Sequence, residues 1–138
     1  MKPAVRKDII FSSKKGIEPS MVSELYDNAG LRRPTRDFNR MGEMLNNSDI
    51  IISAWDGQQL VGLLRAITDY RYCCYLSDLA VRKECQRQGI GKRLVDELHQ
   101  ILGEEVMILL LAAPEASEYY PKIGFAKLTN AFAILRKK

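Results

Sequence analysis

The chain has 138 residues, of which 46% are hydrophobic and 28% are charged, with a formal net charge of +4 at pH 7. These values are ordinary for a soluble domain with a proper hydrophobic core, and we interpret residues 1–138 as one domain. Three cysteines, two of them adjacent, exclude a disulfide framework, and a single histidine argues against a metal site. No apolar run approaches the roughly 20 residues of a membrane span, and the N-terminus lacks the apolar core of a signal peptide. We therefore expect a cytoplasmic protein without a membrane partner.

The first part of the chain predicts one strand and two helices. Ile9–Phe11 is a short apolar strand, and Pro19 opens a helix that continues to Asn28. A second helix is expected from Thr35 to Leu45, where apolar residues follow the helical spacing. The connection between the two helices, Leu31-Arg32-Arg33-Pro34, is short, rigid and basic.

From residue 49 the pattern changes to strands. Asp49–Trp55 and Leu60–Ile67 flank the turn residues Asp56-Gly57, which is the pattern of a β-hairpin. Tyr72–Val81 follows as a third strand. A three-stranded meander is therefore expected in the middle of the chain.

A short basic loop follows this meander and ends in Gly89-Ile90-Gly91, where an amphipathic helix from Ile90 to Leu102 begins. Backbone N–H groups at such a helix start have no partner, and glycines let phosphates approach the main chain. The loop therefore predicts a cradle for a pyrophosphate. Leu94 replaces the third glycine of a dinucleotide fingerprint, and Gln86 replaces the first glycine of a P-loop.

The last part of the chain predicts three more strands and a short helix. Val106–Ala113 is a nearly unbroken apolar run, typical of a strand covered on both faces. Residues 114–124 form a short helix that carries Tyr119-Tyr120. Phe125–Leu128 and Ala131–Leu135 are expected to form a closing antiparallel pair. The predicted order of elements is β-α-α-β-β-β-α-β-α-β-β.

Two motifs in this order carry a resemblance to a known family. Gln86-Arg87-Gln88-Gly89-Ile90-Gly91 matches the pattern Gln/Arg-x-x-Gly-x-Gly/Ala and starts five residues beyond the end of an apolar strand. Residues 116–125, Ala-Ser-Glu-Tyr-Tyr-Pro-Lys-Ile-Gly-Phe, are similar to Ala-x-x-Phe-Tyr-x-Lys-x-Gly-Phe. These are the acetyl-CoA signature and the C-terminal motif of the GCN5-related N-acetyltransferase (GNAT) superfamily. The resemblance covers roughly residues 50–130.

The resemblance implies an α/β (α+β) fold, a mixed and mostly antiparallel sheet of about six to seven strands flanked by about four helices. It also implies acetyl-CoA as co-substrate and no metal. In this family the backbone near the end of the fourth strand holds the pantetheine arm, and a main-chain N–H there can polarise the thioester carbonyl. The implied acetyl-CoA-binding residues are Leu79, Ala80, Val81, Gln86, Arg87, Gln88, Gly89, Ile90, Gly91 and Lys92.

The charges near the glycines fit such a ligand. The basic residues around the loop are Arg82, Lys83, Arg87, Lys92 and Arg93. A basic pI would also suit nucleic acid, but aromatic residues are not interleaved with the basic ones and no DNA-binding motif is present, so we expect no nucleic-acid partner. Cys85 lies in the same loop, where the helix N-terminus and nearby arginines could lower its pKa; an ordinary loop thiol is the alternative.

By the resemblance, Tyr120 is the general acid that protonates the departing thiolate, because its phenol is protonated at neutral pH. Tyr119 occupies a slot that is normally a buried Phe. Some family members carry a Glu base on the fourth strand, and Tyr75 stands there in this chain. Asp78 is the nearest substitute, either as a base acting through water or as a residue that stabilises a bulge in the strand. At or near the position of Pro114, many members carry an Asn that contacts the pantetheine arm, a contact that Pro cannot make.

The implied reaction moves an acetyl group from acetyl-CoA to a primary amine of a small molecule by direct attack in a ternary complex, and an arylalkylamine is one candidate acceptor. Candidate residues for the acceptor side are Arg32, Arg33, Tyr70 and Tyr72. Two alternatives stay open: a non-catalytic acyl-CoA-binding or sensor module, and acetylation of a protein or peptide amine. A homodimer is compatible with the resemblance, although no segment specifies an interface.

Overall fold

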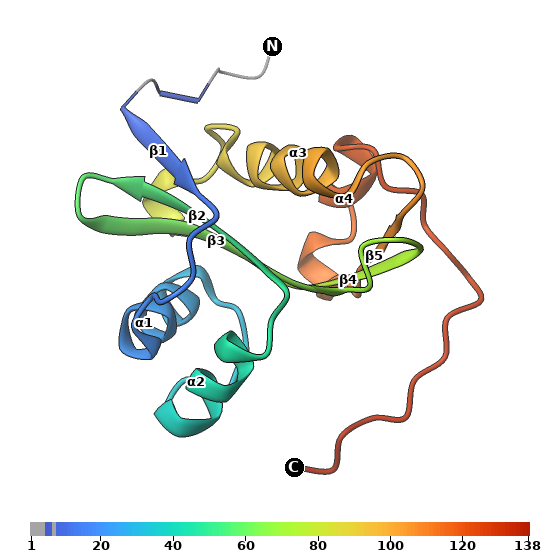
Figure 1. Cartoon of the computed structure of the whole chain (residues 1–138), viewed down its shortest axis with the longest axis horizontal. Coiled ribbons are helices and arrows are strands. Elements are labelled where there is room, and N and C mark those ends of the chain that lie inside the picture. Colours follow the sequence, from blue (N-terminus) through green and yellow to red (C-terminus); the bar gives the residue numbers. More distant parts are fainter. Residues whose placement is uncertain (1–4, 7) are drawn as a thin grey trace.

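A five-stranded sheet in the order β1-β2-β3-β4-β5 forms the centre of the computed structural model, which describes residues 5–6 and 8–138 (Figure 1). The strands are β1 (Ile9–Ser12), β2 (Ile50–Asp56), β3 (Gln59–Thr68), β4 (Cys73–Val81) and β5 (Met107–Leu109). Strands β1 to β4 pair antiparallel, and β5 pairs parallel with β4. The predicted mixed, mostly antiparallel sheet is therefore confirmed.

Helices cover both faces of this sheet, as expected (Figure 1). They are α1 (Pro19–Ala29), α2 (Phe38–Asn46), α3 (Ile90–Leu102) and α4 (Tyr119–Lys122), with 3₁₀ turns at Lys83–Cys85 and Pro114–Ala116. Helices α1 and α2 pack on one face and α3 packs on the other. Within the described residues, none of the helices combines the length and the apolarity needed to cross a membrane.

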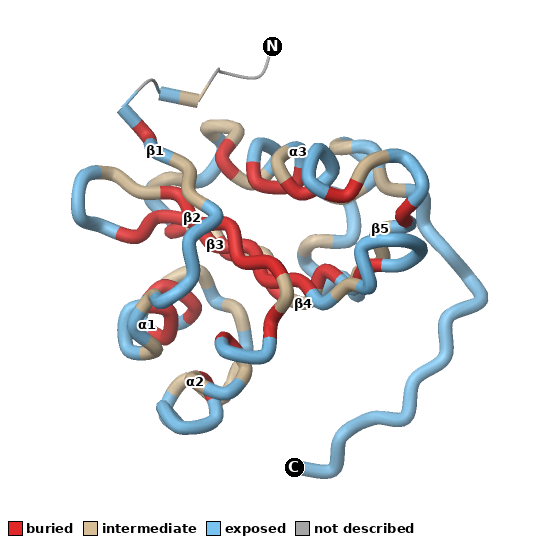
Figure 2. Tube along the Cα trace, viewed as in Figure 1, coloured by how far each residue is buried: buried red, intermediate tan, exposed pale blue. Residues whose placement is uncertain are grey.

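The packing of α3 follows directly from its sequence. Ile90, Leu94 and Leu98 are spaced by four residues, so they share one face and are completely buried against β2, β3 and β4. On the opposite face of the sheet, α1 buries Leu25 and Tyr26. Burial of such side chains stabilises the fold by roughly 1.5–3 kcal/mol each. Figure 2 shows buried segments in red along the central strands and, separately, on parts of α1 and α3.

A bulge in β4 changes which face its side chains point to. Asp78 lies opposite Arg65 of β3, but Leu76 lies opposite the next residue, Ala66, so Ser77 is the extra residue. Before the bulge, Leu76 faces the core beneath α3; after it, Ala80 faces α1 and α2. Because side chains alternate along a strand, one extra residue exchanges the two faces.

Strands β4 and β5 diverge soon after they meet. Only residues 73–75 of β4 pair with β5, so the edge of β4 from Leu76 to Val81 has no neighbouring strand on that side. Strand β5 is also shorter than the apolar run Val106–Ala113 predicts, because the chain leaves β4 after Leu109. An open wedge between the two strands results, and the glycine loop lies at its wide end.

The closing pair of strands predicted over Phe125–Leu128 and Ala131–Leu135 is wrong for this structure, in which neither segment is a strand. The sheet of the described residues has five strands rather than six to seven. Residues 129–138 extend away from the body of the molecule (Figures 1 and 2). A strand requires a neighbouring strand for its backbone hydrogen bonds, and residues 129–138 do not lie beside one.

Candidate active site

The loop between β4 and α3 presents backbone amides at the start of a helix. Arg87 and Gly89 both adopt positive φ angles, 63° and 84°, which turn the chain into α3. The first hydrogen bond of the helix runs from the Arg93 N–H to the Gly89 C=O at 3.0 Å. The amides of residues 90–92 therefore have no acceptor within the helix, and the positive end of the helix dipole adds to them. This arrangement can bind phosphate oxygens.

The end of β4 turns its backbone toward the open wedge. The Arg82 N–H donates to the Val61 C=O at 2.8 Å, which makes Val81 and Gly62 a non-hydrogen-bonded pair of the ladder. The N–H and C=O of Val81 therefore point away from β3. Leu79, two residues earlier, points the same way, and the Gln86 side chain donates to the Val81 C=O at 2.9 Å. A polar, extended ligand arm can pair with this edge.

Tyr119 lies directly over the glycine loop. A Cβ atom placed on Gly91 would come within 2.6 Å of the Tyr119 hydroxyl oxygen. Burial, followed by the negative charge of Asp96, raises the pKa of Tyr119. The side chain is 37% exposed, so it is less enclosed than its motif position implies, and its hydroxyl reaches the loop.

Tyr120 is half-buried between two aromatic rings. It makes edge-to-face contacts with Tyr119, at 5.3 Å between ring centroids, and with Phe125, at 5.6 Å. Burial, followed by Tyr119, raises the pKa of Tyr120, whereas the positive charge of Arg33 acts in the opposite direction. The phenol is consequently protonated at neutral pH and can donate a proton.

Asp78 is completely buried in a network of donors. Its carboxylate accepts hydrogen bonds from Tyr26 Oη at 2.8 Å, Arg33 Nε at 2.7 Å and Arg65 Nε at 2.6 Å. Burial alone would raise the pKa of Asp78, but the hydrogen bonds and charges of the two arginines outweigh burial and hold this pKa below its usual value. An ionised carboxylate with both oxygens engaged is a poor proton acceptor. Its contacts are those of a residue that stabilises the bulge at Ser77.

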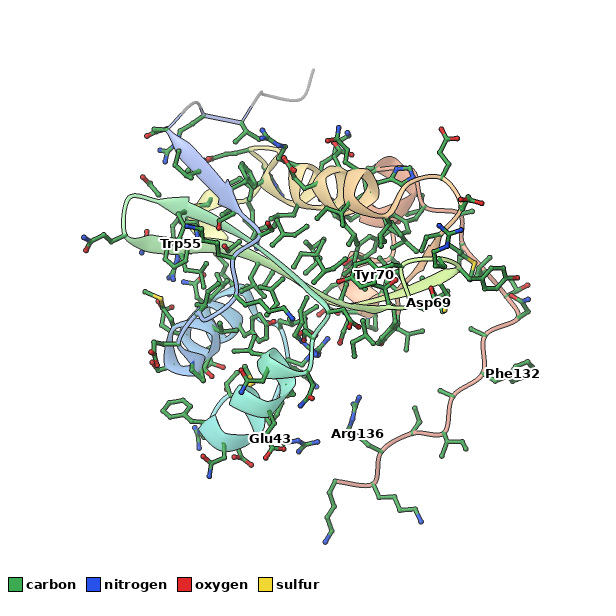
Figure 3. The ribbon with its side chains drawn as sticks, in the orientation of Figure 1. Glu43, Trp55, Asp69, Tyr70, Phe132 and Arg136 are labelled. Carbon is green, nitrogen blue, oxygen red and sulfur yellow. The ribbon has the colours of Figure 1, made fainter. Side chains whose placement is uncertain are left out.

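The structure does not bring the four acceptor-side candidates together. Arg33 is held at the bulge, where it also donates to the Ser77 C=O at 2.8 Å, and Arg32 precedes it in the loop between α1 and α2. Tyr70 and Tyr72 lie in the turn before β4, shown by the label of Tyr70 in Figure 3. This turn is at the other end of β4 from Val81, about 26 Å away at ~3.3 Å per residue.

Most of the basic residues near the glycines already have acidic partners, at 2.7, 2.8 and 2.9 Å: Arg82 with Glu24, Lys92 with Asp96 and Arg93 with Glu97. Arg82 is buried and ties α1 to the end of β4 instead of facing a ligand. Lys83 and Arg87 are exposed and make none of the ion pairs found in the described part of the chain. These two cations are therefore available to an anionic ligand.

The environment of Cys85 is opposite to the one its position indicates. Burial, followed by the negative charge of Glu84, raises the pKa of this thiol. Cys85 is therefore protonated at neutral pH and weakly nucleophilic. Among residues 5–6 and 8–138, no three His, Cys, Asp or Glu side chains are grouped so that they could hold a metal ion.

Sequence reasoning missed Tyr26 and Arg65, the buried partners of Asp78. Arg65 is a charged residue inside the otherwise apolar run Leu60–Ile67, and this was the available signal, because a buried charge requires a partner. Tyr26 gives no comparable signal, since an aromatic residue on the buried face of a helix needs no special explanation.

Several known proteins are similar to this chain in fold and in sequence. The family model of the acetyltransferase (GNAT) domain matches residues 24–133. An uncharacterised N-acetyltransferase from Pyropia yezoensis is 34% identical over 128 residues, which cover 88% of this chain and 72% of that protein. A GNAT-family acetyltransferase from Streptococcus pneumoniae TIGR4 superposes with a TM-score of 0.76 at 26% identity and covers 94% of this chain and 99% of its own.

The same fold occurs in PaiA N-acetyltransferase from Thermoplasma acidophilum, solved in complex with coenzyme A. The TM-score is 0.73 at 17% identity, with 90% of this chain and 92% of that chain covered. The match to the family model, over 24–133, takes in α2 to α4, the glycine loop and both tyrosines. The chain therefore belongs to the GNAT family of acetyltransferases and is an acyltransferase enzyme.

Proposed function

We propose that this enzyme transfers the acetyl group of acetyl-CoA to a primary amine of a small molecule, by direct attack in a ternary complex. The observation that carries the proposal is the continuity between two features: the open backbone edge of β4 ends where the amide cradle of residues 90–92 begins. A ligand with a polar arm attached to a pyrophosphate fits both features at once, and CoA has this chemistry.

In this proposal the pyrophosphate binds the amides of residues 90–92, with Lys83 and Arg87 as additional cations. The pantetheine arm pairs with the backbone of residues 79–81. The N–H of Leu79 would then donate to the thioester carbonyl oxygen and stabilise the negative charge that develops there. The structure of PaiA, which has the same fold and was solved in complex with coenzyme A, supports coenzyme A as the ligand in this proposal.

The chemical step needs one proton donor. The amine nitrogen forms a bond to the carbonyl carbon, the carbon–sulfur bond breaks, the nitrogen releases one proton to water as the amide forms, and the thiolate takes a proton from the phenol of Tyr120. The phenolate is then reprotonated from solvent. A phenol whose pKa is raised by burial is protonated over the whole neutral range, so it is always ready to act as this acid.

We assign no protein base to the amine. The carboxylate of Asp78 is enclosed by Arg33, Arg65 and Tyr26, and its pKa is lowered, so it would hold a proton weakly and could not reach a substrate without breaking the network. The enzyme instead selects the neutral form of the amine, which loses its proton to water. For a Lys-like amine of pKa ~10.4, about 1 in 2500 molecules is neutral at pH 7.

The acceptor approaches from the loop between α1 and α2, in this proposal. Arg33 attaches this loop to the bulge of β4, and its positive charge acts to lower the pKa of Tyr120, which supports an acceptor position on this side of β4. Tyr70 and Tyr72 lie in the turn before β4 rather than in this loop, so we assign them no contact with the acceptor. The broader class, a small primary amine, remains our assignment.

Free-thiol release from acetyl-CoA, measured against polyamines, arylalkylamines, aminoglycosides, amino acids and short peptides, tests the proposal. We expect amine-dependent release with at least one small amine. Release with peptides alone would replace the small-molecule acceptor by a protein or peptide amine. Acetyl-CoA binding without release for any amine would contradict the proposed reaction.

A further inference from the structure

The guanidinium of Arg33 has donors to spare. A guanidinium carries five N–H groups in a planar fork. Three of them are engaged: Nε donates to Asp78 at 2.7 Å, Nη2 to the Ser77 C=O at 2.8 Å and Nη1 to the Arg32 C=O at 2.6 Å. One N–H on each Nη atom therefore has no acceptor within the part of the chain that the structure describes.

The charges around Arg33 do not balance. Among the described residues, Asp78 is the sole carboxylate that pairs with Arg33, and Asp78 is shared with Arg65, at 2.7 and 2.6 Å. The hydroxyl of Tyr26 also donates to this carboxylate, and it is neutral because burial, followed by the charge of Asp78, raises its pKa well above the usual value. Two guanidinium charges thus share one carboxylate charge.

The surplus positive charge reaches the surface at Arg33. The side chain of Arg65 is 9% exposed and that of Asp78 is completely buried. The side chain of Arg33 is 28% exposed. A ligand can therefore contact this cluster through Arg33, and a partly buried charge that lacks a full counter-charge favours an anionic ligand.

The loop that holds Arg33 adds further positive charge. Residues 30–37 contain three arginines and a single acidic residue, Asp37, whose side chain accepts the Arg40 N–H at 3.0 Å at the start of α2. Arg32 and Arg36 are exposed and take part in none of the ion pairs of the described residues. Clustered charges of one sign raise the local concentration of an oppositely charged ligand.

Arg33 lies beside the region assigned to the chemical step. It donates to the C=O of Ser77, two residues before Leu79, whose N–H holds the thioester carbonyl in the proposed function. Two residues of a strand span about 7 Å, at ~3.3 Å per residue. Burial raises the pKa of Tyr120, and the positive charge of Arg33 acts against this rise. A few bonds are enough to join an anion on Arg33 to an amine at the thioester.

We propose that the acceptor is a small amine with an anionic group, a carboxylate or a phosphate, a few bonds from its primary amine, and that Arg33 binds this group. The two free N–H groups match two oxygens of either anion, and such charge-assisted pairs fix orientation as well as adding affinity. The bound anion would balance the cluster and direct the amine toward the thioester. This inference narrows the acceptor class of the proposed function and rests on that function.

Initial rates of thiol release with two matched pairs of amines test the inference. β-Alanine is paired with propylamine, and O-phosphoethanolamine with ethanolamine, so each pair differs by one anionic group. We expect kcat/KM, calculated for the neutral amine, to be at least about tenfold higher for the anionic member of at least one pair. The pair with the larger preference distinguishes a carboxylate from a phosphate.

Two negative outcomes are distinguishable. Equal values within both pairs, or release only with amines that lack an anionic group, would overturn this inference and leave the acetyl transfer intact. Absence of release with every amine, anionic or not, would overturn the proposed function and this inference with it.

Arg33→Met separates recognition of the anion from a structural role. Without Arg33, Asp78 still pairs with Arg65 and their charges balance, so we expect a folded protein that has lost the preference for the anionic amine. A purely structural role would lower kcat/KM for both members of a pair and keep the preference. Arg33→Lys keeps the charge but loses the planar fork, and should retain an intermediate preference.

Arg71→Met is the matched control for these variants. Arg71 is exposed in the turn before β4, and its substitution removes the same positive charge. We expect its preference for the anionic amine to equal that of the wild type. A preference that a folded Arg33 variant leaves unchanged, or that Arg71→Met abolishes equally, would overturn the inference.

Discussion

The hydroxyl oxygen of Tyr119 occupies the space that a side chain on Gly91 would need, at 2.6 Å from the position of a Cβ atom. The next ring atom of Tyr119 is 3.7 Å away, an ordinary contact distance. A side chain at the second glycine of the loop would therefore have to displace the hydroxyl of Tyr119. The two motifs that indicate the family are in direct contact in space.

Gly91→Ala is therefore expected to weaken acetyl-CoA binding, by about tenfold, because Tyr119 or the start of α3 must move. Adding Tyr119→Phe should recover most of this loss, since the clashing atom is the hydroxyl. Calorimetric titration with acetyl-CoA measures both effects. Gly42→Ala in α2 is the control, because its Cβ would meet only Pro19 at 3.6 Å. Equal losses in the single and the double variant would contradict this relationship.

Tyr120→Phe removes the proposed proton donor and keeps the aromatic contacts with Tyr119 and Phe125. We expect kcat to fall by roughly 10²-fold with acetyl-CoA affinity nearly unchanged. Steady-state thiol release and calorimetry give the two quantities. Tyr75→Phe is the matched control: Tyr75 is 37% exposed near the start of β4, and its loss of a hydroxyl should leave kcat unchanged. Full activity in Tyr120→Phe would remove Tyr120 from the mechanism.

Asp78→Asn should destabilise the protein strongly, by about 3–5 kcal/mol, because it leaves buried arginines without their counter-charge. Urea unfolding measures the loss. Asp56→Asn breaks the exposed pair with Arg6, at 2.6 Å, and should cost about 1 kcal/mol or less. If Asp78→Asn instead kept its stability and lost activity, Asp78 would be a catalytic base.

The same network makes stability depend on pH in the acid range. The folded-state pKa of Asp78 lies below its unfolded value of ~3.9, so the unfolded state binds the proton more readily. This contribution is complete above the unfolded pKa and is lost as the pH falls through the folded one. Unfolding free energies measured from neutral pH downward should fall less in Asp78→Asn than in the wild type. An identical fall in both would mean that other carboxylates govern acid unfolding.

Because we assign no base to the enzyme, we expect the pH dependence of kcat/KM to follow the titration of the amine substrate. We expect kcat/KM to rise about tenfold per pH unit until the pKa of the amine, and no loss of acid function below the pKa of Tyr120, which is raised above its ordinary value of ~10. Repeating the profile with an amine of lower pKa should move the plateau by the same amount. A plateau at a fixed pH for all amines would reveal a titrating base on the enzyme.

Local signals predicted much of the fold and the glycine turn at the start of α3, where we propose that the acetyl donor binds. The apolar spacing of Ile90, Leu94 and Leu98 predicts α3, and the glycines before it predict the cradle, because both depend on residues close together in the chain. The network around Asp78 joins α1, β3 and β4, and its partners lie 13 to 52 residues away. No local pattern predicts contacts between residues so far apart in the chain. The sequence therefore left two roles open for Asp78, a base or a residue that stabilises the bulge.

The C-terminal segment shows a case in which a clear local signal gave a wrong prediction. The apolar residues of 131–135 have a strong preference for a strand, and the prediction of a strand follows from composition. Whether a strand forms depends on a neighbour, and the fold leaves the edge of β5 open while the segment extends elsewhere. The composition of the segment therefore does not by itself determine whether a strand forms.

Calorimetric titration of the wild type and of Gly89→Val with acetyl-CoA tests the central claim most directly, that the amide cradle and the open edge of β4 hold this ligand. Gly89 has a φ of 84°, which Val cannot adopt without strain, so the turn into α3 would be distorted. We predict a stoichiometric site in the wild type and a loss of affinity of at least about tenfold in Gly89→Val. Absence of binding to the wild type, or equal affinity in a folded Gly89→Val, would contradict the account.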